Sequence, residues 1–170
     1  MRPPGGPTSS AGHRFLPRWL QLSNTYLPAT GDTALRDPHP IGYATLDGTV
    51  IDTTRMEPSL PWASGALVST GADLNRFYLA LLAGQVVPQP QLRAMLDGVD
   101  MGKPDGMSYG LGVGYTELPC GAQYVGHIGG VGGFTTISGA TTVGRAVTYS
   151  FTGTPSSVDI GGLLTRALCG

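Results

Sequence analysis

Residues 109–154 read YGLGVGYTELPCGAQYVGHIGGVGGFTTISGATTVGRAVTYSFTGT and decide the fold of this 170-residue chain. Short apolar runs rich in Tyr, Val, Thr and Phe alternate there with turns that contain glycine. These residue types favour strands, and short breaks favour pairing of each run with the next. The stretch therefore predicts an antiparallel meander of three to four strands. The runs are Tyr109–Leu118, Gln123–Ile128, Phe134–Ala140 and Ala146–Phe151.

A histidine stands at the end of the second run, in Gly126-His127-Ile128-Gly129-Gly130. Glycines beside it let another backbone or a ligand come close, so His127 is a candidate site residue. From the residues alone the alternative stays open, because a lone histidine in a strand is more often structural.

Two helices are predicted before the meander. The first has Thr70 as its N-cap with Asp73 three positions later, and it ends at Gly84. The second runs from about Pro90 to Leu96, with proline in its first turn. The first helix repeats apolar residues at the spacing of a core-facing stripe, which are Leu74, Phe77, Tyr78, Leu81 and Leu82.

A third helix is predicted after the meander, from about Val158 to Leu168, with Ser156 or Ser157 as its N-cap. Residues 30–61 are rich in Asp, Pro and Gly and predict a loop. At most two short strands are expected there, Ile41–Thr45 and Thr49–Asp52. The fold class that follows is α+β, an antiparallel sheet with a C-terminal helix and two preceding helices.

Composition excludes several classes of function. The net charge is −1 and charged residues make up 12% of the chain. This composition does not indicate the excess of basic residues that binds nucleic acid or an anionic membrane. No apolar run approaches the roughly 20 residues that span a bilayer. We expect no cofactor and no metal, because no ligand spacing appears and no helix follows the glycines of residues 129–133.

The N-terminal residues 1–14 are rich in Pro, Gly and Ser. They predict either a disordered tail or a start codon that lies inside a longer reading frame. They lack the apolar core of a signal peptide, so no export signal is expected in the chain as written.

Three segments in this order resemble penicillin-recognising serine hydrolases of the D-alanyl-D-alanine carboxypeptidase and class C β-lactamase type. They are Ala63–Phe77, Tyr109–Val113 and Gly126–Gly129. The resemblance covers about Leu20 to Gly170. It implies that residues 15–170 are the C-terminal part of a β-lactamase/transpeptidase-like domain.

In that family three motifs meet at the site, namely Ser-x-x-Lys, Tyr-x-Asn or Ser-x-Asn, and a Lys/His-Thr/Ser-Gly triplet. His127-Ile128-Gly129 matches the third, with Ile128 in place of the hydroxyl residue. The first two are missing from the sequence. The only lysine is Lys103, and Asp100 stands three residues before it. The resemblance therefore implies a chain without the catalytic serine.

The resemblance also assigns roles to site residues. His127 would act beside the nucleophile, and the backbone N–H of Gly130 would be one oxyanion donor. Ile128 and Gly129 would contact substrate. Trp62 corresponds to a tryptophan of the substrate cleft in relatives, with a position in the core as the alternative. Gly114 stands where an arginine is expected in close carboxypeptidase relatives, which together with Ile128 favours an esterase-like or degenerate member.

Cys120 and Cys169 lie at positions similar to a disulfide pair in some secreted carboxypeptidases of this family. Such a bridge closes a loop of about 50 residues and would stabilise the fold by about 4 kcal/mol. The alternative is two free thiols in a reducing compartment. Relatives are secreted or extracytoplasmic, whereas the location of this chain is left open.

Two hypotheses follow. In the first, the chain is part of a serine hydrolase that acts through an acyl-enzyme on peptide, ester or β-lactam carbonyls and is inactive until its N-terminal part is restored. The partners are then a peptidoglycan-like peptide or a similar substrate, and the missing part itself. In the second, the chain is a non-catalytic module that binds a peptide or protein at an open sheet edge.

Overall fold

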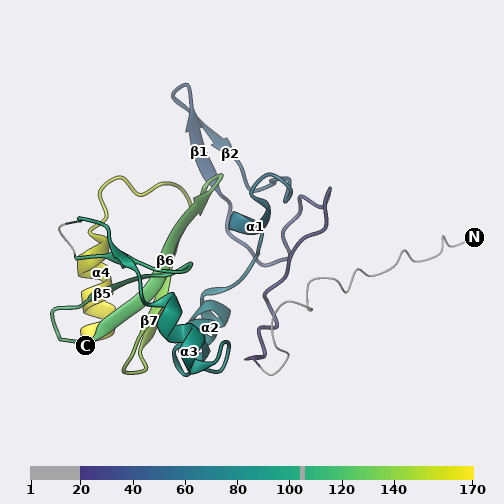
Figure 1. The fold of residues 1–170 in the computed structure, drawn as a ribbon. Helices are drawn as coiled ribbons and strands as arrows, with labels where there is room; N and C mark the ends of the chain where they lie inside the picture. The colour runs from purple at the N-terminus through teal and green to yellow at the C-terminus, as the bar shows by residue number, and fades with distance from the viewer. Residues whose placement is uncertain (1–19, 104–105) are drawn as a thin grey trace, which may run out of the picture.

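The computed structural model describes residues 20–103 and 106–170, and the expectation for residues 1–14 lies outside them. The fold is α+β, as predicted, and centres on one six-stranded antiparallel sheet in the order β3-β4-β5-β6-β7-β8 (Figure 1). Each strand pairs with the next one in sequence, which confirms the meander. The strands are β3 Val99–Asp100, β4 Ser108–Tyr109, β5 Gly114–Glu117, β6 Gln123–Val131, β7 Phe134–Thr141 and β8 Ala146–Phe151.

The first predicted run, Tyr109–Leu118, is divided between β4 and β5 instead of forming one strand. A tight turn separates the two, in which Gly110 N donates to Val113 O and Gly112 has a φ of 80°. Glycine adopts this left-handed conformation without steric cost, so the chain reverses there. This turn and the added β3 raise the strand number from the predicted three to four to six.

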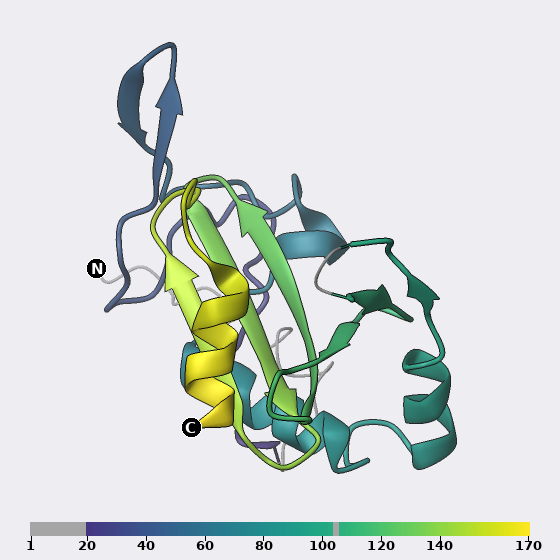
Figure 2. The ribbon, with the colours of Figure 1, turned by 90° about the vertical axis from the view of Figure 1, so that its left-hand side faces the viewer.

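Helices cover both faces of the sheet (Figure 2). On one face α2 (Gly71–Leu82) and α3 (Gln89–Met95) pack on buried residues of β6 and β7. On the other face α4 (Ile160–Cys169) forms a second core. The first core is built from Tyr78, Leu81, Leu92, Val113, Val125 and Ala140, and the second from Leu118, Tyr124, Ile137, Leu164 and Leu168.

The N-cap residues of α2 and α4 can be compared with the predicted ones. Thr70 caps α2 as expected, since its side chain accepts a hydrogen bond from Asp73 N. The cap predicted for α4 at Ser156 or Ser157 is wrong. Asp159 is the N-cap, and its carboxylate accepts from Gly162 N at 2.9 Å. A carboxylate placed before that first turn satisfies the free amide there, so the helix begins at Ile160.

Two elements lie outside the main sheet. The strands β1 (Tyr43–Leu46) and β2 (Thr49–Asp52) form a two-stranded hairpin that projects from the body of the molecule (Figure 1). Both were predicted within two residues of their bounds. The one-turn helix α1 (Trp62–Gly65) was not predicted, because four residues carry no periodic signal.

The hydroxyl groups of two core tyrosines are shielded from solvent. Burial raises the pKa of Tyr78 to about 12, and the nearby Tyr109 adds to the shift. Burial also raises the pKa of Tyr124, whose hydroxyl donates to Ser138 O at 3.1 Å. A tyrosine whose pKa is raised in the folded state stabilises the fold at pH values below the ordinary tyrosine pKa of about 10. This contribution to stability is lost as the pH rises through the folded-state pKa.

The free energy of unfolding is therefore expected to fall between about pH 10 and pH 12, by about 1.4 kcal/mol per pH unit for each buried tyrosine. Urea unfolding at a series of pH values measures this slope. Tyr78→Phe should make the slope shallower, whereas Tyr43→Phe, in the exposed hairpin, should not. An equal slope in wild type and Tyr78→Phe would contradict the prediction.

Candidate functional site

The predicted site residues of β6 share one exposed stretch of the strand. Residues Tyr124 to Gly126 are buried under the helices, and residues 127–130 are exposed where the strand leaves the core. Ile128 is 50% exposed. The sequence thus placed four candidates on a segment that is open to a ligand.

One edge of this stretch is open as well. β5 pairs with β6 from Glu117↔Gln123 to Gly114↔Gly126, while β7 pairs with β6 from Tyr124↔Thr141 to Val131↔Phe134. Among the described residues, the β5 side of residues 127–131 is therefore unpaired. Backbone groups on such an edge can hydrogen bond to a bound molecule.

The register indicates which amides face this open edge. β6 and β7 are joined by the two-residue turn Gly132-Gly133, in which Gly133 has a φ of 78°. A tight turn is closed by a hydrogen-bonded pair, here Val131 and Phe134, and the next pair in an antiparallel ladder is not hydrogen bonded. Gly130 belongs to that next pair, opposite Thr135. Its N–H is accordingly directed away from β7, toward the open edge.

His127 has one hydrogen-bond partner that the sequence analysis did not identify. The hydroxyl of Tyr109 lies 2.9 Å from His127 Nε2, and the two rings meet edge to face with centroids 5.8 Å apart. The sequence predicts Tyr109 to lie in a strand, but nothing in the residue pattern connects it to a residue 18 positions later. The contact exists because β4, β5 and β6 are neighbours in the sheet.

His127 and Ile128 lie on opposite faces of β6. Successive side chains alternate along a strand, and the register pairs His127 with Ser138 and Ile128 with Ile137. Ile137 belongs to the core beneath α4. The structure therefore leaves His127, Gly129 and the Gly130 amide on one exposed stretch of β6 but turns the Ile128 side chain toward the α4 face.

Trp62 is 65% exposed, so the alternative of a core position is wrong. Its helix α1 lies against the end of β6, because a Cβ on Gly65 would come within 2.8 Å of the Val131 side chain. Trp62 also has a φ of 43°, a left-handed conformation that is unusual for a bulky residue and costs about 1–3 kcal/mol. Its role in a substrate cleft remains a prediction.

A cavity of about 700 Å³ opens beside this region, between residues 23–40, residues 53–58, the start of α2 and the β6–β7 turn. Val131 and Gly132 line it, but His127, Gly130 and Trp62 do not. The cavity is therefore a neighbour of the predicted site and not the site itself. The chemistry is better located by the exposed, hydrogen-bonded His127 than by this cavity.

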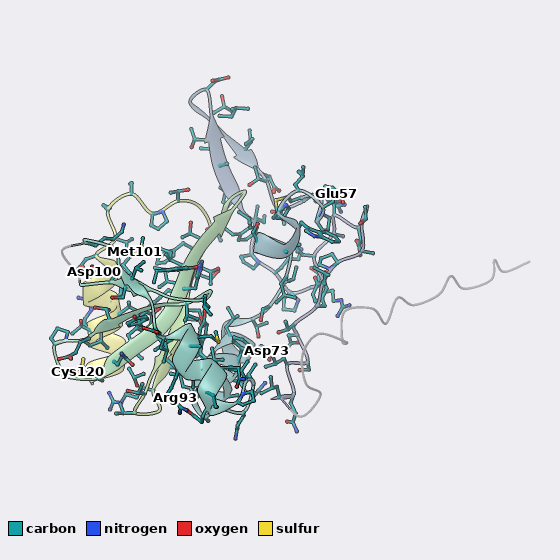
Figure 3. The ribbon with its side chains drawn as sticks, in the orientation of Figure 1. Glu57, Asp73, Arg93, Asp100, Met101 and Cys120 are labelled. Atoms are coloured by element: carbon teal, nitrogen blue, oxygen red, sulfur yellow. A yellow bond between two sulfur atoms is a disulfide. The ribbon has the colours of Figure 1, made fainter. Side chains whose placement is uncertain are left out.

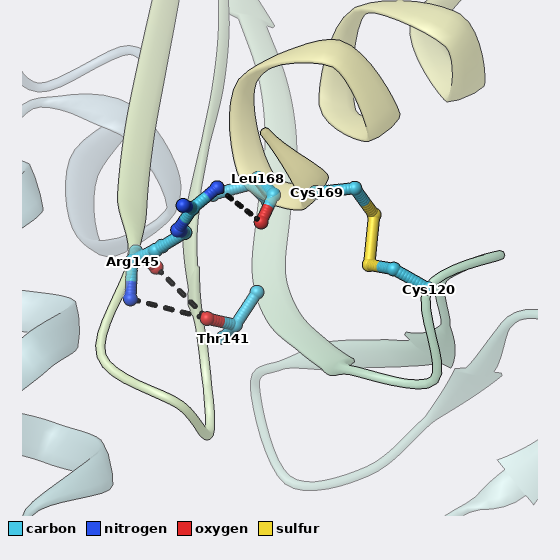
Figure 4. The surroundings of a disulfide bond; sticks show 5 residues. All are labelled: Cys120, Thr141, Arg145, Leu168 and Cys169. Atoms are coloured by element: carbon cyan, nitrogen blue, oxygen red, sulfur yellow. Dashed lines mark hydrogen bonds between the residues drawn. A yellow bond between two sulfur atoms is a disulfide. The ribbon is translucent and has the colours of Figure 1, made fainter.

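The predicted disulfide is present. Cys120 and Cys169 are bonded, with their Cα atoms 5.8 Å apart, and the bridge ties the β5–β6 turn to the end of α4 (Figure 4). Arg145 Nη1 also donates to Leu168 O at 3.3 Å at the same end of the helix. Within residues 20–103 and 106–170, no helix is long and apolar enough to cross a membrane.

The β-lactamase family model matches residues 9–167, almost the whole chain. The chain belongs to the β-lactamase family. The resemblance inferred from the three sequence segments is thereby confirmed at the level of the family.

Several solved structures share the fold. A D-stereospecific amidohydrolase from Streptomyces sp. is 29% identical with a TM-score of 0.80, and the match covers 90% of this chain and 46% of that one. A D-amino acid amidase from Ochrobactrum anthropi SV3 is 25% identical with a TM-score of 0.62, covering 80% and 41%. A penicillin-binding protein from Bacillus halodurans is 15% identical with a TM-score of 0.69, covering 88% and 46%, and supports the fold alone. This β-lactamase-family chain spans less than half the length of these structures.

Proposed function

We propose that this chain is the C-terminal part of a serine hydrolase that cleaves amide or peptide bonds through an acyl-enzyme, and that it is inactive alone. The observation that carries the proposal is the exposed His127–Gly130 stretch of β6 with its open edge, in a β-lactamase-family sequence without Ser-x-x-Lys. These residues would form one side of the proposed active site. The nucleophilic serine would come from the other part of the enzyme.

The role proposed for residues 127–130 is to stabilise the negative charge that develops on the substrate carbonyl oxygen. A serine from the other part would attack the carbonyl and form the acyl-enzyme, and the Gly130 N–H would donate to the oxyanion. His127, on the same strand three residues earlier, would face the substrate beside the serine. The direction of the Gly130 amide toward the open edge supports this role.

Trp62 is proposed as a substrate contact on the neighbouring wall. It is exposed, it belongs to the helix that packs on Val131, and its backbone is held in a left-handed conformation. Residues kept in such conformations are frequent at ligand sites, because the surrounding structure must offset their cost. Ile128 is a weaker candidate, since its side chain lies on the opposite face from His127.

The proposed substrate class rests on two of the similar structures. One is a D-stereospecific amidohydrolase and the other is a D-amino acid amidase. We propose an amide or peptide with a D-residue as substrate. Neither Gly114 nor Ile128 can supply a side-chain hydrogen bond to a terminal carboxylate, so an amide is favoured over a free carboxylate end.

A reactive penicillin tests the missing nucleophile, since it acylates the serine of such enzymes. Incubation of the chain with this reagent is expected to leave its intact mass unchanged. A stoichiometric adduct would show that a nucleophile is present and would overturn the proposal. Gel filtration of the same sample shows that a folded chain was tested.

A second experiment restores the half of the enzyme that would carry the nucleophilic serine. The half of the Streptomyces amidohydrolase that this chain does not match is joined to its N-terminus, and hydrolysis of D-phenylalanine amide is measured. Labelling and turnover that are both lost when the serine is replaced with alanine would support the proposal. A folded joined chain that is neither labelled nor active would favour the non-catalytic binding module instead, which the sequence without a nucleophile also allows.

A further inference from the structure

The contact between Tyr109 and His127 lies on the exposed stretch of β6 and affects which imidazole nitrogen carries the proton. Tyr109 is 37% exposed and comes from β4, whereas His127 comes from β6. The phenolic oxygen is 2.9 Å from Nε2, a distance typical of a well-formed hydrogen bond. In a neutral imidazole one ring nitrogen donates a hydrogen bond and the other accepts one.

The chemistry of the two groups gives this bond a direction. A phenol O–H is a strong donor, and the unprotonated nitrogen of a neutral imidazole is a strong acceptor. If Tyr109 donates to Nε2, the proton of His127 must lie on Nδ1. This is the minor form of a free histidine side chain, which prefers the proton on Nε2.

Strand pairing limits the freedom of Tyr109. Its backbone is paired on both sides, with Val99 of β3 and with Gly114 of β5, and its ring meets the His127 ring edge to face. The phenol is therefore held by the sheet and by the ring contact as well as by its hydroxyl. An anchored donor can select one tautomer of its partner, as second-layer groups do for histidines at other sites.

We propose that Tyr109 is a positioning residue that holds neutral His127 in the Nδ1–H tautomer. The inference rests on the proposed function for its consequence, because an Nδ1–H group makes His127 a hydrogen-bond donor to a substrate oxygen. It supplies the donor that Ile128 lacks at the position where the family motif has a hydroxyl residue. His127 then acts as a donor toward substrate and not as the general base.

Long-range proton–nitrogen correlation spectra of the ¹⁵N-labelled 170-residue chain at pH 8 distinguish the two tautomers by the shifts of the ring nitrogens. In the wild type the major His127 signal is expected to be the Nδ1–H form. In Tyr109→Phe, which keeps the ring but removes the hydroxyl, the major form should become Nε2–H. His127→Gln assigns the signal.

Tyr115→Phe is the matched control. Tyr115 lies on the adjacent β5, and its hydroxyl accepts one hydrogen bond, from Gly98 N at 3.0 Å. Removing that hydroxyl should leave the tautomer of His127 unchanged, and an amide correlation spectrum shows that each variant is folded. A wild-type Nε2–H form, or an Nδ1–H form that persists in folded Tyr109→Phe, would overturn the inference. Because the readout needs no activity, these results are independent of whether the joined chain is an enzyme.

Discussion

Replacing Asp73 with alanine is expected to lower the free energy of unfolding by about 3–5 kcal/mol. The residue lies at the start of α2 (Figure 3) and is 1% exposed. Its carboxylate accepts three hydrogen bonds. Oδ2 accepts from Asn24 N and Thr25 Oγ1, both at 2.9 Å, and Oδ1 accepts from Arg76 Nη1 at 3.1 Å.

The size of the loss follows from the donors that the substitution leaves behind. A buried donor without an acceptor costs about 1–3 kcal/mol, and hydrogen bonds to charged groups contribute about 1.5–3 kcal/mol each. Thr25 keeps a contact to Ser69 Oγ at 2.9 Å, which limits the loss at that group. The bonds of Asp73 attach residues 24–25 to α2, so the segment before the hairpin should also become less protected from hydrogen exchange.

Urea unfolding followed by circular dichroism measures the change. Asp73→Asn keeps one carbonyl oxygen and should lie between wild type and alanine. Asp100→Ala is the matched control, because Asp100 is exposed and, among the described residues, accepts one hydrogen bond, from Gly102 N at 2.8 Å. Its effect should stay within about 0.5 kcal/mol. A loss below 1 kcal/mol for Asp73→Ala would contradict the role of this carboxylate.

Replacing both Cys120 and Cys169 with alanine is expected to cost about 4 kcal/mol. The bridge closes a loop with a sequence separation of 49, and its loss restores the freedom of that loop in the unfolded chain. The helix α4 should stay in place in the folded state, because Leu164 and Leu168 remain buried against the sheet. The change therefore acts through the unfolded state more than through the fold.

Reduction provides the control for this variant. Wild type in reductant should unfold at the same urea concentration as the double variant, and reductant should not change the variant itself. Alkylation of the unfolded wild type without reductant should add no mass, since the described residues hold no free cysteine. Addition of two alkyl groups, or equal stability of the oxidised wild type and the double variant, would rule the bridge out as a source of stability.

Local signals in the sequence were sufficient for most elements of the fold. Alternating apolar runs predicted the meander, and the Thr70–Asp73 spacing predicted the start of α2, because these depend on neighbours along the chain. The cap of α4 was predicted at the wrong residue because Ser156, Ser157 and Asp159 could each serve, and the residue pattern does not decide which of them accepts from Gly162 N. The split of Tyr109–Leu118 was missed because a glycine turn inside an apolar run leaves the residue pattern almost unchanged.

At the site, the sequence by itself determined the candidate strand segment, the family and the lack of Ser-x-x-Lys. These are properties of residue order, and the sequence carries them without a structure. Only the tertiary structure decided that Trp62 is exposed, that Ile128 faces away from His127 and that Tyr109 bonds to Nε2. The physical reason is that exposure, strand register and side-chain contacts depend on which distant segments of the chain pack together. A local residue pattern does not specify that packing.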